Sequence, residues 1–381
     1  MPEAVIVEAV RTPIGKRRGA LAHIHPVDLS AHVLRELAAR TGVDPADVED
    51  VQWGCVTQLG DQSSNIGRFA VLAAGWPESV PAVTVNRACG SSQQALDHAA
   101  AAIISGHQEM VVVGGVESMS RVPLGAAREF GEPYGPLAKK RFGVSDFGQG
   151  TGAEMIAERW GLNRRTVDEF AALSHARTAA AVDAGAFDEQ LVPVSTPART
   201  LTADEGLRRG TTVDTLSALK PSFRPDGVIH AGNASQISDG AAAMLVTTPQ
   251  RAAALGLTPI ARYHTGAVAG ADPVMVLTGP IPATAKVLDR AHLTIDDIGV
   301  FEVNEAFAPV PLAWLAETKA DPDRLNPLGG AIAVGHPLGA SGAILMTRMI
   351  HHMRAHDIRY GLQTMCEGGG TANATIVELI S

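Results

Sequence analysis

A glycine-rich stretch near the C-terminal end decides how the rest of the chain is interpreted: Asn326 to Gly342 reads N-P-L-G-G-A-I-A-V-G-H-P-L-G-A-S-G. Its glycines permit close backbone approach and positive φ, which predicts a tightly specified loop. His336 lies in the middle, before Pro337, and a small-residue helix start follows. An imidazole held on a rigid turn suits a general base, because its unperturbed pKa lies near neutrality. A lone histidine without partners would instead be a buried packing residue, so the rest of the chain must decide.

Composition sets the class of protein. The chain has 381 residues, of which 46% are hydrophobic, and a net charge of -9. This length predicts a large core and two or three domains, and the charge argues against non-specific nucleic-acid binding. The three cysteines, Cys55, Cys89 and Cys366, are typical of a reducing compartment. No apolar run reaches the about 18–20 residues of a membrane span, and no signal peptide is evident, so we expect a cytoplasmic protein.

Strand-like and helix-like segments alternate on either side of an irregular middle region. This alternation predicts an α/β architecture with a largely parallel sheet. The rhythm breaks between Ser118 and Ala234, which predicts a large insertion or lid, and after residue 260 the first layout returns as a faint duplication. The expected strands are 3–10, 50–57, 82–85, 110–113 (ending at Gly114-Gly115), 299–303, 359–365 and 375–380. The expected helices are 28–41, 68–74, 93–105, 151–160, 166–184, 306–320 and 343–355. The alternating pattern resumes after the middle region at 241–247, 260–269 and 281–291.

Three residues at strand ends could carry chemistry. Cys89 stands between a buried strand and a buried helix, where a helix N-terminus can lower a thiol pKa, although a buried cysteine is usually inert. Cys366 repeats this arrangement and is followed by three glycines after Glu367, whose N–H groups could face a ligand as an oxyanion hole requires. Asn304 follows a strand where a helix begins, so it could be a helix cap or a site residue. Cys55 has no such setting and is assigned to the core.

Taken together and in order, these motifs resemble the thiolase family over nearly the whole chain. The similar segments are Arg11-Thr-Pro-Ile-Gly, Asn86-x-x-Cys89-Gly-Ser-Ser, Ala231-Gly-Asn-Ala-Ser, Gly279-Pro-Ile-Pro-Ala, Asn304-Glu-Ala-Phe-Ala, the Asn326-to-Gly342 stretch and Cys366-x-Gly-Gly-Gly.

The resemblance implies an α/β fold of two similar halves with an inserted loop domain. The N-terminal half would comprise residues 1–117 and 235–259, the loop domain 118–234 and the C-terminal half 260–381. The loop domain would bind coenzyme A (CoA) and mediate oligomerisation. The protein would assemble as a dimer or a dimer of dimers, a homotetramer, with Arg121 to Phe142 deciding between them.

The resemblance also implies a role for each site residue. Cys89 would be the nucleophile that carries the acyl group, and His336 would deprotonate it and later the CoA thiol. Cys366 would protonate the departing acetyl-CoA enolate. Asn304 would hold a water beside His336 to stabilise the first thioester oxygen, and the N–H groups of Cys89 and Gly368 would face the second.

CoA and acyl-CoA thioesters are the expected partners, and CoA is a substrate, so no cofactor and no metal are expected. Arg208, Phe223 and Ser235 fall where the family contacts the nucleotide, the adenine and the pantetheine arm. The alternatives are a surface arginine, a core phenylalanine and a turn serine. The resemblance also allows for a β-oxidation hydratase or dehydrogenase as protein partner; neither nucleic acid nor a membrane span is expected.

Two departures from the family pattern bear on substrate choice. The family usually has Ser or Ala after the nucleophile, whereas this chain has Gly90 followed by Ser91, Ser92 and Gln93. Short-chain biosynthetic relatives carry His-Met where this chain has Gly148-Gln149, which favours longer or bulkier acyl chains.

The sequence therefore predicts an enzyme, a degradative 3-ketoacyl-CoA thiolase with ping-pong covalent cysteine catalysis. The alternative within the class is a biosynthetic acetyl-CoA acetyltransferase that condenses two acetyl-CoA molecules. From another class, the alternative is a catalytically silent, thiolase-like lipid-binding protein, against which the complete set of cysteines, histidine and asparagine argues. A condensing enzyme for carrier-protein substrates is disfavoured by Cys366, because those relatives use a second histidine there.

Overall fold

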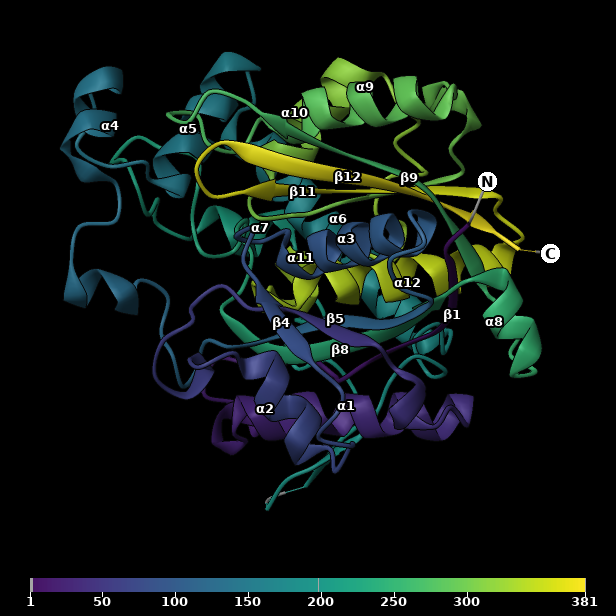
Figure 1. The fold of residues 1–381 in the computed structure, drawn as a ribbon. Helices are drawn as coiled ribbons and strands as arrows, with labels where there is room; N and C mark the ends of the chain where they lie inside the picture. The colour runs from purple at the N-terminus through teal and green to yellow at the C-terminus, as the bar shows by residue number, and fades with distance from the viewer. Residues whose placement is uncertain (1–2, 198, 381) are drawn as a thin grey trace.

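The computed structural model describes residues 3–197 and 199–380 and shows alternating layers of helices and strands (Figure 1). The strands are β1 (Val5–Arg11), β2 (Gly15–Lys16), β3 (Asp50–Gly54), β4 (Ala82–Val85), β5 (Met110–Ser118), β6 (Val194–Ser195), β7 (Thr200–Leu201), β8 (Ser238–Thr247), β9 (Ala261–Gly270), β10 (Val300–Val303), β11 (Tyr360–Glu367) and β12 (Thr371–Leu379). The helices are α1 (Pro26–Thr41), α2 (Ile66–Ala73), α3 (Ser91–Ile104), α4 (Gly135–Phe142), α5 (Gln149–Arg159), α6 (Arg164–Asp183), α7 (Val213–Ser217), α8 (Pro249–Ala254), α9 (Pro280–Ala291), α10 (Pro309–Thr318), α11 (Ala331–Val334) and α12 (Ser341–His356).

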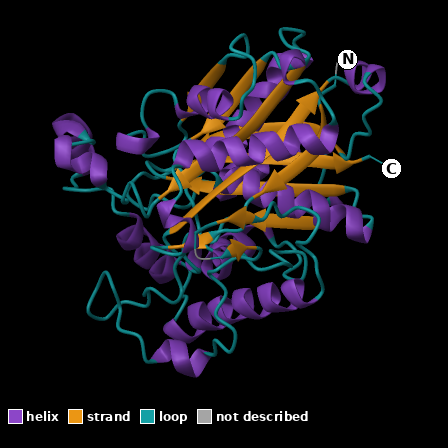
Figure 2. Cartoon of the chain, turned by 90° about the horizontal axis from the view of Figure 1, so that it is seen from below, coloured by secondary structure: helices purple, strands orange, loops and turns teal. Residues whose placement is uncertain are grey.

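Two helices form the central layer of the molecule. α3 and α12 pack against each other between one half-sheet that contains β9, β11 and β12 and another that contains β1, β4, β5 and β8 (Figure 1). α9 covers the outer face of the first half-sheet with α10 packed beside it, and α1 and α2 cover the second half-sheet. Seen from below, the strands gather in the centre with helices on both sides (Figure 2). The fold is a mixed α/β architecture of two similar halves, as expected.

The two half-sheets are joined at one seam. The strand order is β10-β11-β12-β9-β1-β8-β5-β3-β4, with β2 attached to β8. β1 pairs with β9 only through Val5 and Ile6, whereas it pairs with β8 along most of its length. The short seam lets the halves separate on either side of the central helices.

The prediction of a largely parallel sheet is wrong. Among the named strands of the described residues, β3–β4, β3–β5 and β10–β11 pair in parallel, and the other neighbours in the large sheet are antiparallel. β8 follows the long segment 118–234 and inserts between β1 and β5, opposite in direction to both. β12 follows β11 after a turn of three residues, which permits only an antiparallel hairpin.

The predicted strand end at Gly114-Gly115 is also wrong, because β5 continues to Ser118. A Cβ on Gly114 would lie 2.1 Å from the Ala242 carbonyl oxygen, and one on Gly115 would lie 2.4 Å from that of Gly339. These glycines therefore mark close approach of neighbouring backbone rather than a turn.

Several helix ends follow local sequence signals. α1 begins with Pro26 after His25, whose side chain accepts from the Val27 N–H, and it ends at Gly42 with φ of 68°. Pro309 and Pro311 lie in the first turn of α10, as predicted, where a missing N–H costs nothing.

The segment between the two parts of the N-terminal half has a different character. It contains α4, α5, α6 and α7, and α4 stands apart from the layered body at the left of Figure 1. Within the described ranges, no helix is long and apolar enough to cross a bilayer.

Candidate active site

His336 is held through its backbone by a distant segment and through its ring by the glycine-rich loop itself. Its backbone N–H donates to the Gln236 carbonyl oxygen at 3.0 Å, and its Nδ1 lies 2.6 Å from Ser341 Oγ. The Ser341 hydroxyl donates its proton to the Pro337 carbonyl oxygen at 2.9 Å, which leaves Oγ as an acceptor for the imidazole. This arrangement assigns the imidazole proton to Nδ1 and leaves the lone pair on Nε2.

Burial keeps this imidazole neutral. His336 is 3% exposed, and desolvation lowers its pKa to about 4. The expected helix start is present, since α12 begins at Ser341, and the short helix α11 inside the loop was not expected.

Asn304 connects the histidine to the second cysteine. Its Nδ2 lies 3.5 Å from His336 Nε2 and 3.9 Å from Cys366 Sγ. Its Oδ1 is buried and has no hydrogen-bond partner among the described residues. Asn304 is not a helix cap, because Ala308 occupies the N-cap position of α10. The side chain is therefore available to organise the site.

Cys89 lies in the turn between β4 and α3. The preceding residue, Ala88, has φ of 43°, a conformation that favours glycine, so the turn is strained. The Cys89 pKa is raised well above its ordinary value, first by burial and then by Cys366, Glu367 and Glu117, while its own backbone N–H opposes the shift. The resting thiol is therefore neutral and needs a base to become a nucleophile.

Cys366 and Gly368 come from the end of β11 and the turn after it. Burial raises the Cys366 pKa to about 12, and the bond from Asn304 opposes this shift. A Cβ on Gly368 would lie 3.6 Å from Gln149 Nε2 and 3.7 Å from Ala88 Cβ. The glycine turn therefore faces the turn that carries Cys89.

The four predicted catalytic side chains thus come from four separate segments and are all buried. Cys55 is buried in another apolar cluster, around Trp53, as the sequence predicted.

Two of the three predicted CoA contacts lie beside the loop that carries Asn304. The Ser235 N–H donates to the Ala306 carbonyl oxygen at 2.9 Å. The Phe223 ring is 47% exposed and stands edge-to-face with Phe307 at 6.0 Å. Arg208 is exposed, and its backbone N–H donates to His175 Nδ1 at 3.3 Å.

Residues that sequence reasoning missed hold the loops in place. Glu117 accepts from the backbone N–H groups of Val56 at 2.9 Å and Gly339 at 2.8 Å, so it links two turns around the site. Glu305 accepts from Asn326 Nδ2 at 3.0 Å and from Ser174 Oγ at 2.7 Å. Glu305 belongs to the Asn304-Glu-Ala-Phe-Ala motif and could have been found there, whereas no sequence motif marks Glu117.

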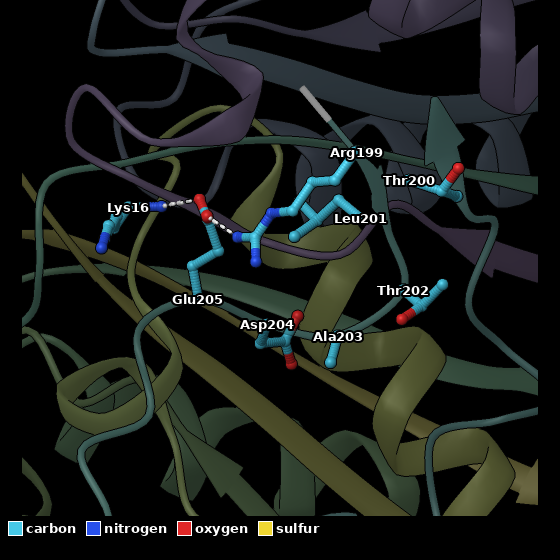
Figure 3. A pocket seen from close by; sticks show the side chains of 8 residues that line it. All are labelled: Lys16, Arg199, Thr200, Leu201, Thr202, Ala203, Asp204 and Glu205. Carbon is cyan, nitrogen blue, oxygen red and sulfur yellow. Dashed lines mark hydrogen bonds and ion pairs between the residues drawn. The ribbon is translucent and has the colours of Figure 1, made fainter. Parts of the chain in front are cut away.

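A separate cavity of about 310 Å³ is lined by Lys16 and residues 199–205 (Figure 3). Glu205 accepts from the Lys16 backbone N–H at 3.2 Å and pairs with Arg199. The lining of this cavity includes none of the predicted catalytic residues. Among the residues described, no group of three or more His, Cys, Asp or Glu side chains is placed to hold a metal ion.

Comparison with known proteins agrees with this geometry. Residues 4–250 match the family model described as the thiolase N-terminal domain, and residues 257–379 match the thiolase C-terminal domain. The chain is 50% identical over 386 residues to the steroid 3-ketoacyl-CoA thiolase FadA6 of Mycobacterium tuberculosis, covering 99% of this chain and 94% of that relative. It is 45% identical over 392 residues to a 3-ketoacyl-CoA thiolase of Erwinia tasmaniensis, covering 100% of both.

A solved structure gives the same result for the fold. The crystal structure of the Bacillus anthracis acetyl-CoA acetyltransferase superposes with a TM-score of 0.91 at 36% identity, covering 100% of this chain and 99% of that one. The chain therefore belongs to the thiolase family and is an acyltransferase.

Proposed function

We propose that the protein cleaves 3-ketoacyl-CoA with CoA to give acetyl-CoA and a shortened acyl-CoA. The observation that carries the proposal is the position of the Asn304 amide, whose Nδ2 lies 3.5 Å from the histidine base and 3.9 Å from the second cysteine. The buried Cys89 thiol is close enough to Cys366 for that group to raise its pKa. The names of the relatives favour cleavage of ketoacyl substrates over condensation of two acetyl-CoA molecules.

In the first half-reaction, His336 Nε2 takes the proton of Cys89, and the thiolate attacks the 3-keto carbon. The C2–C3 bond breaks, Cys366 gives its proton to C2 of the departing enolate, and acetyl-CoA leaves. The proton held by His336 then restores the Cys366 thiol. A neutral imidazole and a neutral Cys366 are the starting states that these transfers need, and the directions of both pKa shifts support them.

In the second half-reaction, His336 takes the proton of the incoming CoA thiol. The CoA sulfur attacks the acyl-Cys89 thioester, Cys89 leaves as a thiolate, and His336 returns the proton to it. The oxyanion donors are the Cys89 and Gly368 N–H groups and a water held by Asn304. Asn304 Oδ1 is buried without a hydrogen-bond partner among the described residues, so it can accept a hydrogen bond from that water. Each such donor typically contributes about 2.7–4 kcal/mol to lowering the barrier.

The test uses two single-cysteine variants and a simple acyl thioester, with mass spectrometry as the readout. We expect Cys89→Ala to form no acyl-enzyme, and Cys366→Ala to become acylated yet fail at carbon–carbon cleavage. Equal acylation of wild type and Cys89→Ala would refute the assignment. Normal acylation without thiolysis of any ketoacyl substrate would favour the lipid-binding alternative.

Substrate size depends on residues at the mouth of the site. Gln149 Nε2 lies 3.6 Å from the place that a Cβ on Gly368 would occupy, so its side chain borders the glycine turn proposed to supply an oxyanion donor. We infer that Gly148 and Gln149 leave room for long or polycyclic acyl groups, in line with the name of the 50% identical relative. A series from acetoacetyl-CoA to polycyclic 3-ketoacyl-CoA tests this, and Gly148→His with Gln149→Met should shift preference toward short chains. Best turnover of acetoacetyl-CoA by wild type would contradict the inference.

We propose that the inserted loop domain, residues 118–234, binds CoA. The N-terminal half then comprises residues 1–117 and 235–259, and the C-terminal half comprises residues 260–381. Phe223 and Ser235 border the Asn304 loop, and Arg208 offers an exposed cation for the nucleotide phosphates. Arg208→Ala should raise KM for CoA with kcat nearly unchanged, because the contact is the same in ground and transition states.

We also propose a cytoplasmic homo-oligomer, since both reactive thiols must stay reduced. β4 is an end strand of the sheet, with Val83 44% exposed, and α2 beside it exposes Phe69 and Leu72. An exposed strand edge beside apolar side chains suits pairing with a second copy. Light scattering should show a loss of the dimer in Val83→Lys. Leu137, in α4, is 83% exposed, and Leu137→Lys should separate dimers of dimers if the segment Arg121 to Phe142 joins them.

A further inference from the structure

Glu367 is a buried carboxyl that the proposed mechanism does not use. It directly follows Cys366 at the end of β11 and has no exposed surface. Its Oε2 accepts from Thr371 Oγ1 at 2.7 Å. Its Oε1 has no hydrogen-bond partner within the part of the chain that the structure describes. An unpartnered buried carboxylate oxygen is costly, so it calls for an explanation.

The unpartnered oxygen lies against the residue after the nucleophile. A Cβ on Gly90 would lie 2.0 Å from Glu367 Oε1 and 2.9 Å from Asn373 Nδ2. Gly90 has φ of -89° and ψ of 8°, which any residue adopts, so the glycine is required by space and not by backbone conformation. Gly90 therefore leaves the space that the carboxyl of Glu367 occupies.

The charges around this carboxyl come from several elements. The charge of Arg87, in the turn before Cys89, favours the ionised carboxyl, whereas the charge of Asp97 of α3 opposes it. The Glu367 charge in turn raises the pKa of the Cys366 thiol. Thr371 and Asn373 of β12 are neutral. Cys89 itself is influenced by Cys366, Glu367 and Glu117 of β5. Burial raises the Glu367 pKa to about 7, with the Thr371 bond and Arg87 opposing this shift and Asp97 adding to it.

We propose that Glu367 is a positioning residue for the nucleophile, whose carboxyl charge over Gly90 controls how easily Cys89 becomes a thiolate. When Glu367 is ionised, its charge opposes the thiolate, and when it is protonated this opposition is lifted. The proposal rests on the assignment of Cys89 as nucleophile.

The experiment measures the rate of iodoacetamide alkylation of Cys89 between pH 5.5 and 9.5, with peptide mass spectrometry as readout. Alkylation depends on the thiolate and not on turnover, so this measurement is separate from the thiolysis test of the proposed function. We expect Glu367→Gln to be alkylated about tenfold faster than wild type at pH 8, equivalent to one pKa unit. The two rates should converge below the pH at which Glu367 is protonated.

Glu302→Gln serves as the matched control, because Glu302 is a buried carboxyl that lies on β10, and its profile should follow wild type. Superimposable profiles for Glu367→Gln and wild type would overturn the proposal. If Glu367→Gln does not fold, Glu367→Asp withdraws the same charge by one methylene, and an unchanged profile for it has the same meaning.

The fit between Glu367 and Gly90 is tested independently by a double-mutant cycle on the melting temperature. Gly90→Ala alone should lower it, and Gly90→Ala with Glu367→Ala should recover most of the loss, because the colliding oxygen is gone. Additive losses would show that the carboxyl does not occupy the space over Gly90.

Discussion

Replacing Ser341 by alanine is expected to weaken catalysis through the tautomer of His336. The Ser341 hydroxyl accepts from His336 Nδ1 at 2.6 Å and donates to the Pro337 carbonyl oxygen at 2.9 Å, so the imidazole proton is confined to Nδ1. Without this acceptor, Nδ1–H is buried and unpaired. The tautomer with the proton on Nε2 then competes, and it cannot accept a proton from Cys89.

The size of the effect follows from the burial of the pair. Leaving a buried donor unpaired typically costs about 1–3 kcal/mol. If this cost falls on the step in which the imidazole acts as base, the rate falls about 5- to 150-fold. The loss should appear in kcat and in the rate of acylation by a simple thioester, with KM for CoA nearly unchanged, because Ser341 contacts the base and not the substrate.

The control is Ser92→Ala. Ser92 is also buried, and its hydroxyl accepts from the Ala343 N–H of the same helix at 2.8 Å. Both variants should lose similar stability in urea unfolding, but only Ser341→Ala should lose kcat. A kcat within twofold of wild type for Ser341→Ala, or an equal loss in Ser92→Ala, would refute the reasoning.

Three further outcomes are expected. Asn304→Ala should lower kcat about 10²- to 10³-fold, as loss of an oxyanion donor does, while Cys89 alkylation continues; an effect confined to KM would contradict the role. Because burial lowers the His336 pKa to about 4, the acid limb of kcat/KM should lie below pH 5.5, and an inflection near pH 6.5 that persists in Glu367→Gln would contradict it. Burial raises the Glu302 pKa to about 8, and Arg348 partly opposes this shift. The folded state therefore binds this proton more tightly than the unfolded chain does. As a result, Glu302 lowers the free energy of unfolding as pH rises from about 4.5 to 8. Glu302→Gln should therefore reduce the loss of unfolding free energy over this range, measured by urea denaturation, and an unchanged slope would exclude Glu302 as its source.

Much of the site could be predicted from the sequence because its residues lie in short motifs with local turn signals. Single turns require the glycine, proline and small residues around His336 and the glycines after Cys366. Such requirements are visible in the sequence because they involve only neighbouring residues. The same local signals predicted several helices, including the prolines that open α10, but not the short helices α4, α7, α8 and α11. They did not predict strand direction, because an insertion between β5 and β8 does not say on which edge, or in which direction, the returning strand will pair.

The sequence by itself determined the family, the α/β alternation and the candidate set Cys89, Asn304, His336 and Cys366. Only the tertiary structure decided which atoms meet: the Nδ1 tautomer set by Ser341, the amide of Asn304 between base and acid, and the carboxyl of Glu367 over Gly90. The reason is physical. Turn and helix preferences act within a few residues, whereas tautomers, pKa values and contacts between distant segments depend on burial and on neighbours that only the folded chain supplies.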